Sequence, residues 1–391
     1  MTGSSGEFQE IAHSGGQVVF NVVTDESGHR KYSIRWQSSR PVPAALFGIY
    51  ALRQGIPVGT IVMGGIGVEW NPPPVPGSVP VFISSDSQGL FGSECPRCHG
   101  YWRTREQPRV CPYCGIVEQR QNFLTQAQRR YVWQYCKRLD EALSDEQDGN
   151  HVIDMDAVAD AAGTDGEKPP FYYTEEQQQH KFSCTTCDAT NDIIGRFGFC
   201  CVCGTRNDLQ EIEGKIIPAI RQRVNDGAVS GATLREIASV FDSFVSQYVR
   251  QLLAGVPMIP ARKNRLQNMK FHNLVSVAGE LKETFGIDLF AGLKAGDREH
   301  ASLMFCRRHV YEHNGGQVDE RYLQESGDTT VRLNQALRED AGSLHRLANS
   351  VARMARNLHE GFHQIFPPEE GPIKAFQEKK ARMAAWEKQR R

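Results

Sequence analysis

Two groups of four cysteines share one spacing, and this spacing constrains the fold more than any other feature of the chain. In each group two residues separate the first pair, twelve residues follow, and two residues separate the second pair, after which comes a glycine. The members are Cys95, Cys98, Cys111 and Cys114 in the first group and Cys184, Cys187, Cys200 and Cys203 in the second. Such a pair places two thiolates on one side of a tight turn, and two pairs complete the tetrahedral ligand set that zinc requires. We therefore expect two zinc ions per chain.

Four thiolates leave no coordination position open for water or substrate, so both sites are expected to be structural zinc ribbons. Cys201 could pair with Cys203 only across a single residue, whereas this kind of turn needs two, so Cys201 is expected to stay outside the site. Cys136 and Cys306 have no partner at ligand spacing and are expected to be small buried hydrophobes. A thiol redox enzyme built on the cysteine pairs is disfavoured because each pair has a matching pair.

Composition and charge narrow the class of protein. The net charge of -1 gives no overall attraction to nucleic acid or to anionic membranes, so any such binding needs a local patch. No apolar run reaches the roughly 20 residues of a transmembrane helix, and the N-terminus lacks a signal-peptide pattern. Eleven cysteines without a secretion signal favour metal binding over disulfides. We expect a cytoplasmic protein with no membrane partner.

A small β-rich domain is expected over residues 15–90. Strand-like patterns occupy residues 17–23, 31–36, 59–68 and 79–84, whereas residues 44–52 have helical spacing. The second strand pattern alternates most clearly, and an Asp-Glu-Ser-Gly turn over residues 25–28 joins it to the first.

The region between the ribbons, residues 121–178, is expected to contain a helix and an acidic linker. Thr125 and Gln128 form a capping-box pattern that predicts a helix start, and the following apolar positions give this helix one hydrophobic face. Ten acidic residues lie between Asp140 and Glu167, with a short helical pattern over residues 152–162. A glycine- and proline-rich break at residues 163–170 marks the main linker.

From about residue 208 onward, apolar residues recur with helical periodicity in at least four segments, which predicts a helical bundle. The last pattern begins at Leu333 and Leu337 and runs to Phe362, before Pro367 and Pro368 end the bundle. The expected fold is a multidomain α+β chain with a small N-terminal β-rich domain, two four-cysteine zinc ribbons and a C-terminal all-α bundle. Its expected parts are the β-rich domain 15–90, ribbon 91–120, helix and acidic linker 121–178, ribbon 179–207, helical domain 208–368 and basic tail 369–391.

The first ribbon also carries a mixture of aromatic and basic residues between its cysteine pairs. They are Tyr101, Trp102, Arg103, Arg105 and Arg109. Aromatic rings can stack on bases and arginines can contact phosphates, so this mixture suits nucleic-acid binding. The alternative is that Tyr101 and Trp102 pack the ribbon against its neighbours.

One predicted helix of the C-terminal domain has a polar, titratable face at its end. Asp297 is expected as its N-cap, and His313-Asn-Gly-Gly316 is expected to end it, because asparagine and glycine favour left-handed caps. The polar face carries Arg308, His309, Glu312 and His313. Arg307 lies amid the apolar face, which suggests either a snorkelling side chain or a second exposed surface.

Residues 308–313 resemble the motif of the HEPN superfamily, in which an arginine and a histidine stand four to six residues apart. The resemblance covers residues 208–366, and His309 meets the preference for a polar residue after the arginine. It implies a small helical bundle, a metal-independent endoribonuclease and a homodimer that pairs two motifs. A role in defence or toxin biology is suggested by the family alone.

The resemblance also implies a division of labour. His313 would be the base that deprotonates a ribose 2′-hydroxyl, Arg308 would clamp the phosphate, and His309 and Glu312 would orient or assist. A 2′-hydroxyl nucleophile makes RNA the substrate. Two alternatives remain: His309 and His313 could bind a metal, or the polar helix end could serve only a dimer interface. In the second case the chain is a non-catalytic zinc-ribbon scaffold that binds nucleic acid or a protein partner.

Overall fold

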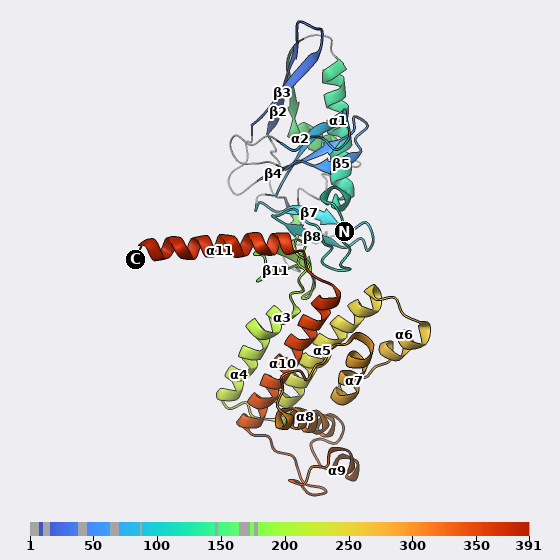
Figure 1. Cartoon of the computed structure of the whole chain (residues 1–391), viewed down its shortest axis with the longest axis vertical. Coiled ribbons are helices and arrows are strands. Elements are labelled where there is room, and N and C mark those ends of the chain that lie inside the picture. Colours follow the sequence, from blue (N-terminus) through green and yellow to red (C-terminus); the bar gives the residue numbers. More distant parts are fainter. Residues whose placement is uncertain are drawn as a thin grey trace, which may run out of the picture. The chain divides into compact units, whose positions relative to one another are not determined.

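The computed structural model describes residues 8–10, 16–37, 45–62, 70–86, 88–144, 148–163, 173–175 and 179–390. The chain divides into two compact units (Figure 1). Unit 1 combines Met1–Gly204 with Glu369–Arg391, and unit 2 is Thr205–Pro368. Among the described residues, no helix combines the length and the apolar character needed to cross a bilayer.

Two three-stranded antiparallel sheets form the N-terminal part of unit 1. The first has the order β3-β2-β9, from β2 (Gln17–Thr24), β3 (Arg30–Gln37) and β9 (Gly149–Asp154). The second has the order β5-β4-β6, from β4 (Leu46–Ala51), β5 (Pro57–Thr60) and β6 (Val79–Ser84). The strands expected at residues 17–23, 31–36 and 79–84 are thereby confirmed. Of the strand expected over 59–68, only residues 59 and 60 lie in β5, residues 61 and 62 lie outside any strand, and residues 63–68 lie outside the described part.

The helix expected over residues 44–52 is wrong, because residues 46–51 form β4 instead. This strand lies in the middle of its sheet, and five of its six residues are buried. A short, fully buried strand reads as a continuous apolar run, which periodicity cannot distinguish from a helix. Gly48 lets the side chain of Ile61 approach the strand closely, since an added Cβ would lie 2.9 Å from the Ile61 Cδ1 atom.

The segment expected as an acidic linker belongs partly to the folded core. Helix α1 (Gln126–Ser144) starts with the expected capping box, in which Thr125 N–H donates to Gln128 Oε1 and Gln128 N–H donates to Thr125 Oγ1. After it, β9 pairs with β2, and helix α2 (Met155–Ala161) follows with Asp154 as its N-cap. Ile153 and Val158 pack in the same core as the two sheets. The short helix expected over residues 152–162 is confirmed as α2, whereas β9 replaces the expected acidic linker over residues 149–154. Of the break expected as the main linker, residues 164–170 lie outside the described part.

The two cysteine groups share one four-stranded sheet with the order β11-β12-β8-β7. Its strands are β7 (Phe91–Glu94), β8 (Tyr101–Thr104), β11 (Gln179–Ser183) and β12 (Thr190–Ile194). Strand β8 of the first group pairs with β12 of the second, so that Trp102 lies opposite Ile193. The two ribbons are thus one body. The 3-10 turn η1 (Arg120–Phe123) leads from this body to α1, and β1 (Phe8–Glu10) pairs separately with β10 (Tyr173–Glu175).

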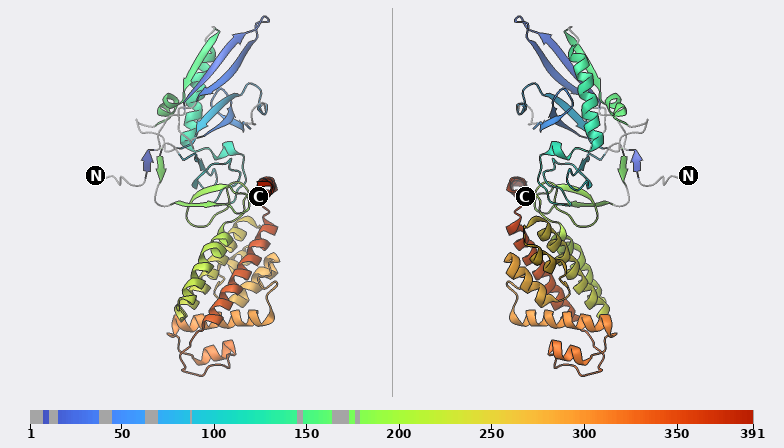
Figure 2. Two further views of the ribbon diagram at one scale, coloured as in Figure 1. Left: turned by 90° about the vertical axis from the view of Figure 1, so that its left-hand side faces the viewer. Right: turned by 90° about the vertical axis from the view of Figure 1, so that its right-hand side faces the viewer.

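Unit 2 is the expected helical bundle (Figure 2). Its long central helices are α5 (Gly231–Gly255) and α10 (Ala341–Ile365), which pack against each other and against α8 (Ala295–His313). The remaining helices are α3 (Asp208–Glu211), the π-helical turn η3 (Ile212–Ile216), α4 (Ile217–Asn225), α6 (Pro260–Gln267), α7 (Leu274–Phe285) and α9 (Glu320–Ser326). Leu333 and Leu337 do not belong to α10. They lie in the loop before it, because Asp340 caps the helix start and accepts a hydrogen bond from Ser343 N–H.

The residues expected as a basic tail form helix α11 (Glu370–Arg390), which has no buried residue. Its start is anchored on the second cysteine group. Glu369 N–H donates to the carbonyl of Cys203, Ile373 packs against the cysteines, and Lys379 pairs with Asp188 at 3.7 Å.

Candidate functional site

The structure brings the four thiols of each cysteine group together. In both groups the ligand atoms lie within 4.8 Å of one another, and each group could hold a metal ion. The Sγ atoms of Cys95 and Cys114 are 3.6 Å apart, and those of Cys184 and Cys203 are 3.7 Å apart. These separations exclude disulfides, which need about 2.05 Å. They match tetrahedral coordination, since metal–sulfur bonds of about 2.3 Å place ligand sulfurs about 3.8 Å apart.

Each cysteine pair closes on a residue with a left-handed backbone. The expected glycines do so at Gly115 with φ 69° and at Gly204 with φ 77°. At the other two pairs the position is taken by His99 with φ 56° and Asp188 with φ 66°. Only some residue types tolerate this conformation, and histidine and aspartate are among those enriched in it. The four turns therefore repeat one backbone geometry, which the sequence shows only at the two glycines.

The cysteines outside the groups have structural surroundings. Cys201 is buried, and its carbonyl accepts hydrogen bonds from Arg109 N–H and Val110 N–H of the first ribbon. It thus joins the two ribbons while its thiol stays outside the ligand group. Burial raises the pKa of Cys136 to about 12, which keeps this thiol neutral as expected of a small hydrophobe.

Two members of the aromatic and basic mixture of the first ribbon are buried, whereas Arg105 and Arg109 are exposed and Tyr101 is partly exposed. Trp102 is fully buried and packs edge-on against Phe123 with ring centroids 5.1 Å apart. Arg103 is only 2% exposed and pairs with Asp192 at 2.5 Å and with Asp86 at 3.1 Å. The nucleic-acid interpretation is therefore wrong for these two side chains, and the packing alternative is confirmed for Trp102. Both side chains hold the shared sheet together.

The polar helix end predicted in unit 2 is the C-terminal end of α8. The helix ends at His313, and Gly315 and Gly316 follow with φ 59° and 88°. Its start lies earlier than expected, at Ala295 with Lys294 as N-cap. Asp297 falls within the first turn, where it pairs with Arg346 at 2.7 Å rather than capping the helix.

Arg308, at this end of α8, faces the carboxylate of Asp242, a residue that no sequence pattern indicated. Its guanidinium lies 3.7 Å from Asp242 on α5, and the two side chains are 15% and 21% exposed. Burial raises the pKa of Asp242 to about 6, an effect that Arg308 opposes and Glu312 reinforces. No other hydrogen bond reaches Asp242 Oδ1 or Arg308 Nε among the described residues. Both atoms are buried, so neither is open to a ligand that binds from solvent.

The two histidines of the motif lie side by side. The rings of His309 and His313 have centroids 4.4 Å apart, with His309 half-buried and His313 exposed, as is Glu312. Burial and the neighbouring His313 lower the pKa of His309. A third imidazole, His272, precedes α7, and its pKa is lowered by burial and by the positive charges of Arg308 and His309.

The structure therefore unites the four motif residues with Asp242 and His272, which come from distant parts of the sequence. No local pattern marks either residue, so only the packing of α5, α7 and α8 could reveal them. Within the described part of the chain, no third side chain completes a metal site with His309 and His313. The metal-binding alternative for the histidine pair is not supported.

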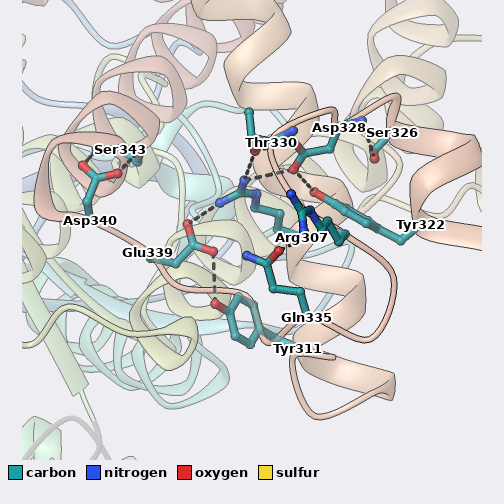
Figure 3. Close-up of polar contacts among 11 residues, drawn as sticks. Arg307, Tyr311, Tyr322, Ser326, Asp328, Thr330, Gln335, Glu339, Asp340 and Ser343 are labelled. Atoms are coloured by element: carbon teal, nitrogen blue, oxygen red, sulfur yellow. Dashed lines mark hydrogen bonds and ion pairs between the residues drawn. The ribbon is translucent and has the colours of Figure 1, made fainter. Parts of the chain in front are cut away.

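Arg307, the residue that fitted neither face, is the centre of a buried polar network (Figure 3). It pairs with Asp328 at 2.9 Å and with Glu339 at 3.4 Å, and both carboxylates are almost completely buried. Tyr322 and Tyr311 donate their hydroxyls to these same carboxylates. The network fastens the loop between α9 and α10 to α8. Arg307 is therefore an internal structural residue, and neither interpretation drawn from the sequence describes it.

Comparison with known proteins adds no relative: no family model, curated protein or solved structure matches the chain. The resemblance to the HEPN superfamily therefore rests on the motif and on its position in a helical unit.

Proposed function

We propose that the chain is a metal-independent endoribonuclease of the HEPN type, with its reaction centre at the C-terminal end of α8. The observation that carries the proposal is that Arg308 and the adjacent imidazoles of His309 and His313 share the last turns of α8, where Arg308 pairs with Asp242. An arginine and a neutral imidazole on one exposed helix end supply a phosphate-binding group and a base.

In the proposed reaction, His313 takes the proton of a ribose 2′-hydroxyl, and the 2′ oxygen attacks the adjacent phosphorus. The new O–P bond replaces the bond to the 5′ oxygen of the next nucleotide, which leaves a 2′,3′-cyclic phosphate and a 5′-hydroxyl. Arg308 binds the phosphate oxygens as negative charge develops on them. The imidazolium formed at His313 returns its proton to the departing 5′ oxygen, and His309 and Glu312 orient or assist.

The two cysteine groups are proposed to hold structural zinc, one ion each. Zinc fits because all four ligands are thiolates at tetrahedral separations, a set that soft metals favour. The ion would supply folding energy to a body whose own core is small, rather than chemistry. Such thiol sites favour a reducing compartment such as the cytoplasm. A homodimer that pairs two α8 ends, and a role in defence, are proposed from the family resemblance.

The test is cleavage of single-stranded RNA in EDTA, after the bound metal content has been measured. Wild type should cut the RNA and leave cyclic phosphate ends. His313→Ala and Arg308→Ala should each lower the rate by about a hundredfold or more, as expected for loss of a base or of a charge-stabilising group. His345→Ala on α10 is the matched histidine control and should keep the wild-type rate. Undiminished cleavage by His313→Ala would sink the catalytic assignment.

The alternative function is a non-catalytic scaffold that binds nucleic acid or a protein. One observation favours it: the ion pair with Asp242 already gives Arg308 a structural partner. RNA binding without cleavage in the wild type would establish this alternative. Cleavage with the expected ends would exclude it.

A further inference from the structure

A groove with an apolar floor lies between the C-terminal half of α5 and helix α6 in unit 2. Its volume is about 400 Å³. Val249, Leu253, Leu266 and Phe271 line the floor, and Phe271 is half-exposed. The groove is open to solvent along α6, of which only Leu266 is buried.

The chain segment that forms this groove is positively charged. The sequence from residue 243 to residue 279 contains no aspartate or glutamate, although it carries Arg250, Arg262, Lys263, Arg265 and Lys270. Arg250 and Lys263 border the groove itself. Arg265 pairs with Glu280 at 3.0 Å. Within the described part of the chain, no carboxylate lies at ion-pair distance from Arg262, Lys263 or Lys270, so these charges are free to meet an anion.

The groove also leads toward the α8 site. Phe271 on its floor is followed directly by His272, which is close enough to Arg308 and His309 for their charges to act on its ring. His272 thus connects the groove, through its neighbour Phe271 in the sequence, with the residues at the end of α8.

We propose that this groove binds single-stranded RNA, with a base stacked on Phe271 and phosphates held by Arg262, Lys263 and Lys270. The inference rests on the proposed function, because it locates the strand that the α8 end would cut. An aromatic floor with a basic rim is the arrangement that single-strand binding uses. A membrane surface fits less well, since a concave groove of this size offers it little apolar contact. An acidic protein segment would meet the same charges, so its binding is measured beside that of RNA.

The first test measures binding of a fluorescent single-stranded RNA by anisotropy, in the Arg308→Ala background so that cleavage does not interfere. Arg262→Glu combined with Lys263→Glu should weaken binding at least about tenfold and reduce the slope of log affinity against log salt by about 1.4, at about 0.7 per phosphate contact. Arg235→Glu combined with Arg338→Glu changes the net charge of unit 2 equally and should leave affinity within about twofold of the parent. The proposal would be overturned if both double variants weakened binding equally, or if neither weakened it.

The second test separates stacking from charge. Phe271→Leu keeps an apolar floor but removes the ring, and should weaken RNA binding about tenfold at constant salt slope. Phe271→Trp should restore binding. Thermal unfolding of each variant reports whether unit 2 is intact. If Phe271→Leu folds and binds as the parent does, no base stacks there and the proposal fails.

These outcomes distinguish the groove from the reaction centre. Groove-dependent binding in a protein whose wild type never cuts RNA would refute the proposed reaction and keep the groove. Cleavage that the groove variants leave unchanged would refute the groove and keep the reaction. If the groove bound anionic phospholipid vesicles or a polyglutamate peptide instead of RNA, and the groove variants lost that binding, the assignment of the ligand would be overturned.

Discussion

The guanidinium of Arg308 lies 3.7 Å from the carboxylate of Asp242, which joins the end of α8 to the middle of α5. This contact holds in place the side chain that the proposed reaction needs as a phosphate clamp. It also sets a buried carboxyl beside a titratable helix end, because Glu312 acts on Asp242 as well. The protonation state of Asp242 therefore changes with pH, and its effect on stability can be measured without RNA.

The first prediction concerns Asp242 and pH. Its folded-state pKa of about 6 lies above the value of about 3.9 that an unfolded aspartate has, so the folded protein binds this proton more tightly. The stability that the protonated Asp242 gives the folded protein is complete below about pH 4 and is lost as pH rises through about 6. Relative to Asp242→Asn, the wild type should lose about 1–2 kcal/mol of unfolding free energy between pH 4 and pH 7, after allowance for solvent screening. Urea unfolding of both proteins across this range measures the difference, and a constant difference would contradict it.

Sequence could predict only part of this site. The motif residues Arg308 and His313 stand close together on one helix, and local periodicity is enough to place them on one face. Asp242 and His272 meet them through the packing of separate helices, for which a single sequence carries no signal. Arg307 was correctly predicted to lie on the apolar face of its helix. Its buried carboxylate partners were not predicted, because they lie in a loop that no pattern indicates.

The second prediction tests the buried ion pair that joins the ribbons. Arg103→Met would leave the carboxylates of Asp192 and Asp86 buried without a cation, because both lie almost wholly inside unit 1. Removing one partner of such a pair costs about 3–5 kcal/mol of unfolding free energy. The neighbouring exposed Arg105→Met should change it by less than about 0.5 kcal/mol. Equal stability of the two variants in urea unfolding would show that the pair contributes nothing.

For the fold, as for the site, features encoded by neighbouring residues were predicted, whereas pairings between distant segments were not. The capping box at Thr125, the hairpin of β2 and β3, and the cysteine turns are local, and each was predicted. The pairing of β9 with β2 and of β8 with β12 joins segments far apart in the sequence, and neither was. The sequence did not predict β9, because Ile153 is its one buried residue and exposed residues, polar and apolar, lie on both sides of it.

The third prediction concerns acid stability of the network in unit 2. Burial raises the pKa of Asp328, but hydrogen bonds from Thr330, Tyr322 and Arg307 outweigh burial and hold this pKa well below its usual range. The stability contributed by this carboxylate is present above about pH 4 and is lost as pH falls through its folded-state pKa. Arg307→Met should cost about 3–5 kcal/mol at neutral pH. It should also weaken the loss of stability between pH 4 and pH 2, which acid titration followed by circular dichroism measures.

Arg332→Met serves as the control for this variant, because Arg332 is exposed in the same loop. Its unfolding free energy should stay within about 0.5 kcal/mol of the wild type at both pH values. An acid profile of Arg307→Met that parallels the wild type would show that Asp328 does not depend on Arg307.

The last prediction assigns the metal ligands of the second ribbon. Wild-type protein should bind two zinc ions per chain by elemental analysis, and Cys200→Ser should bind one, because a four-thiolate site that loses a ligand is strongly weakened. Cys201→Ser should keep both ions, since the Cys201 thiol lies outside the group. The two ribbons share one sheet, so the loss of one ion should lower the stability of the other ribbon too, on the order of several kcal/mol. Two ions in Cys200→Ser together with one in Cys201→Ser would move the ligand from Cys200 to Cys201.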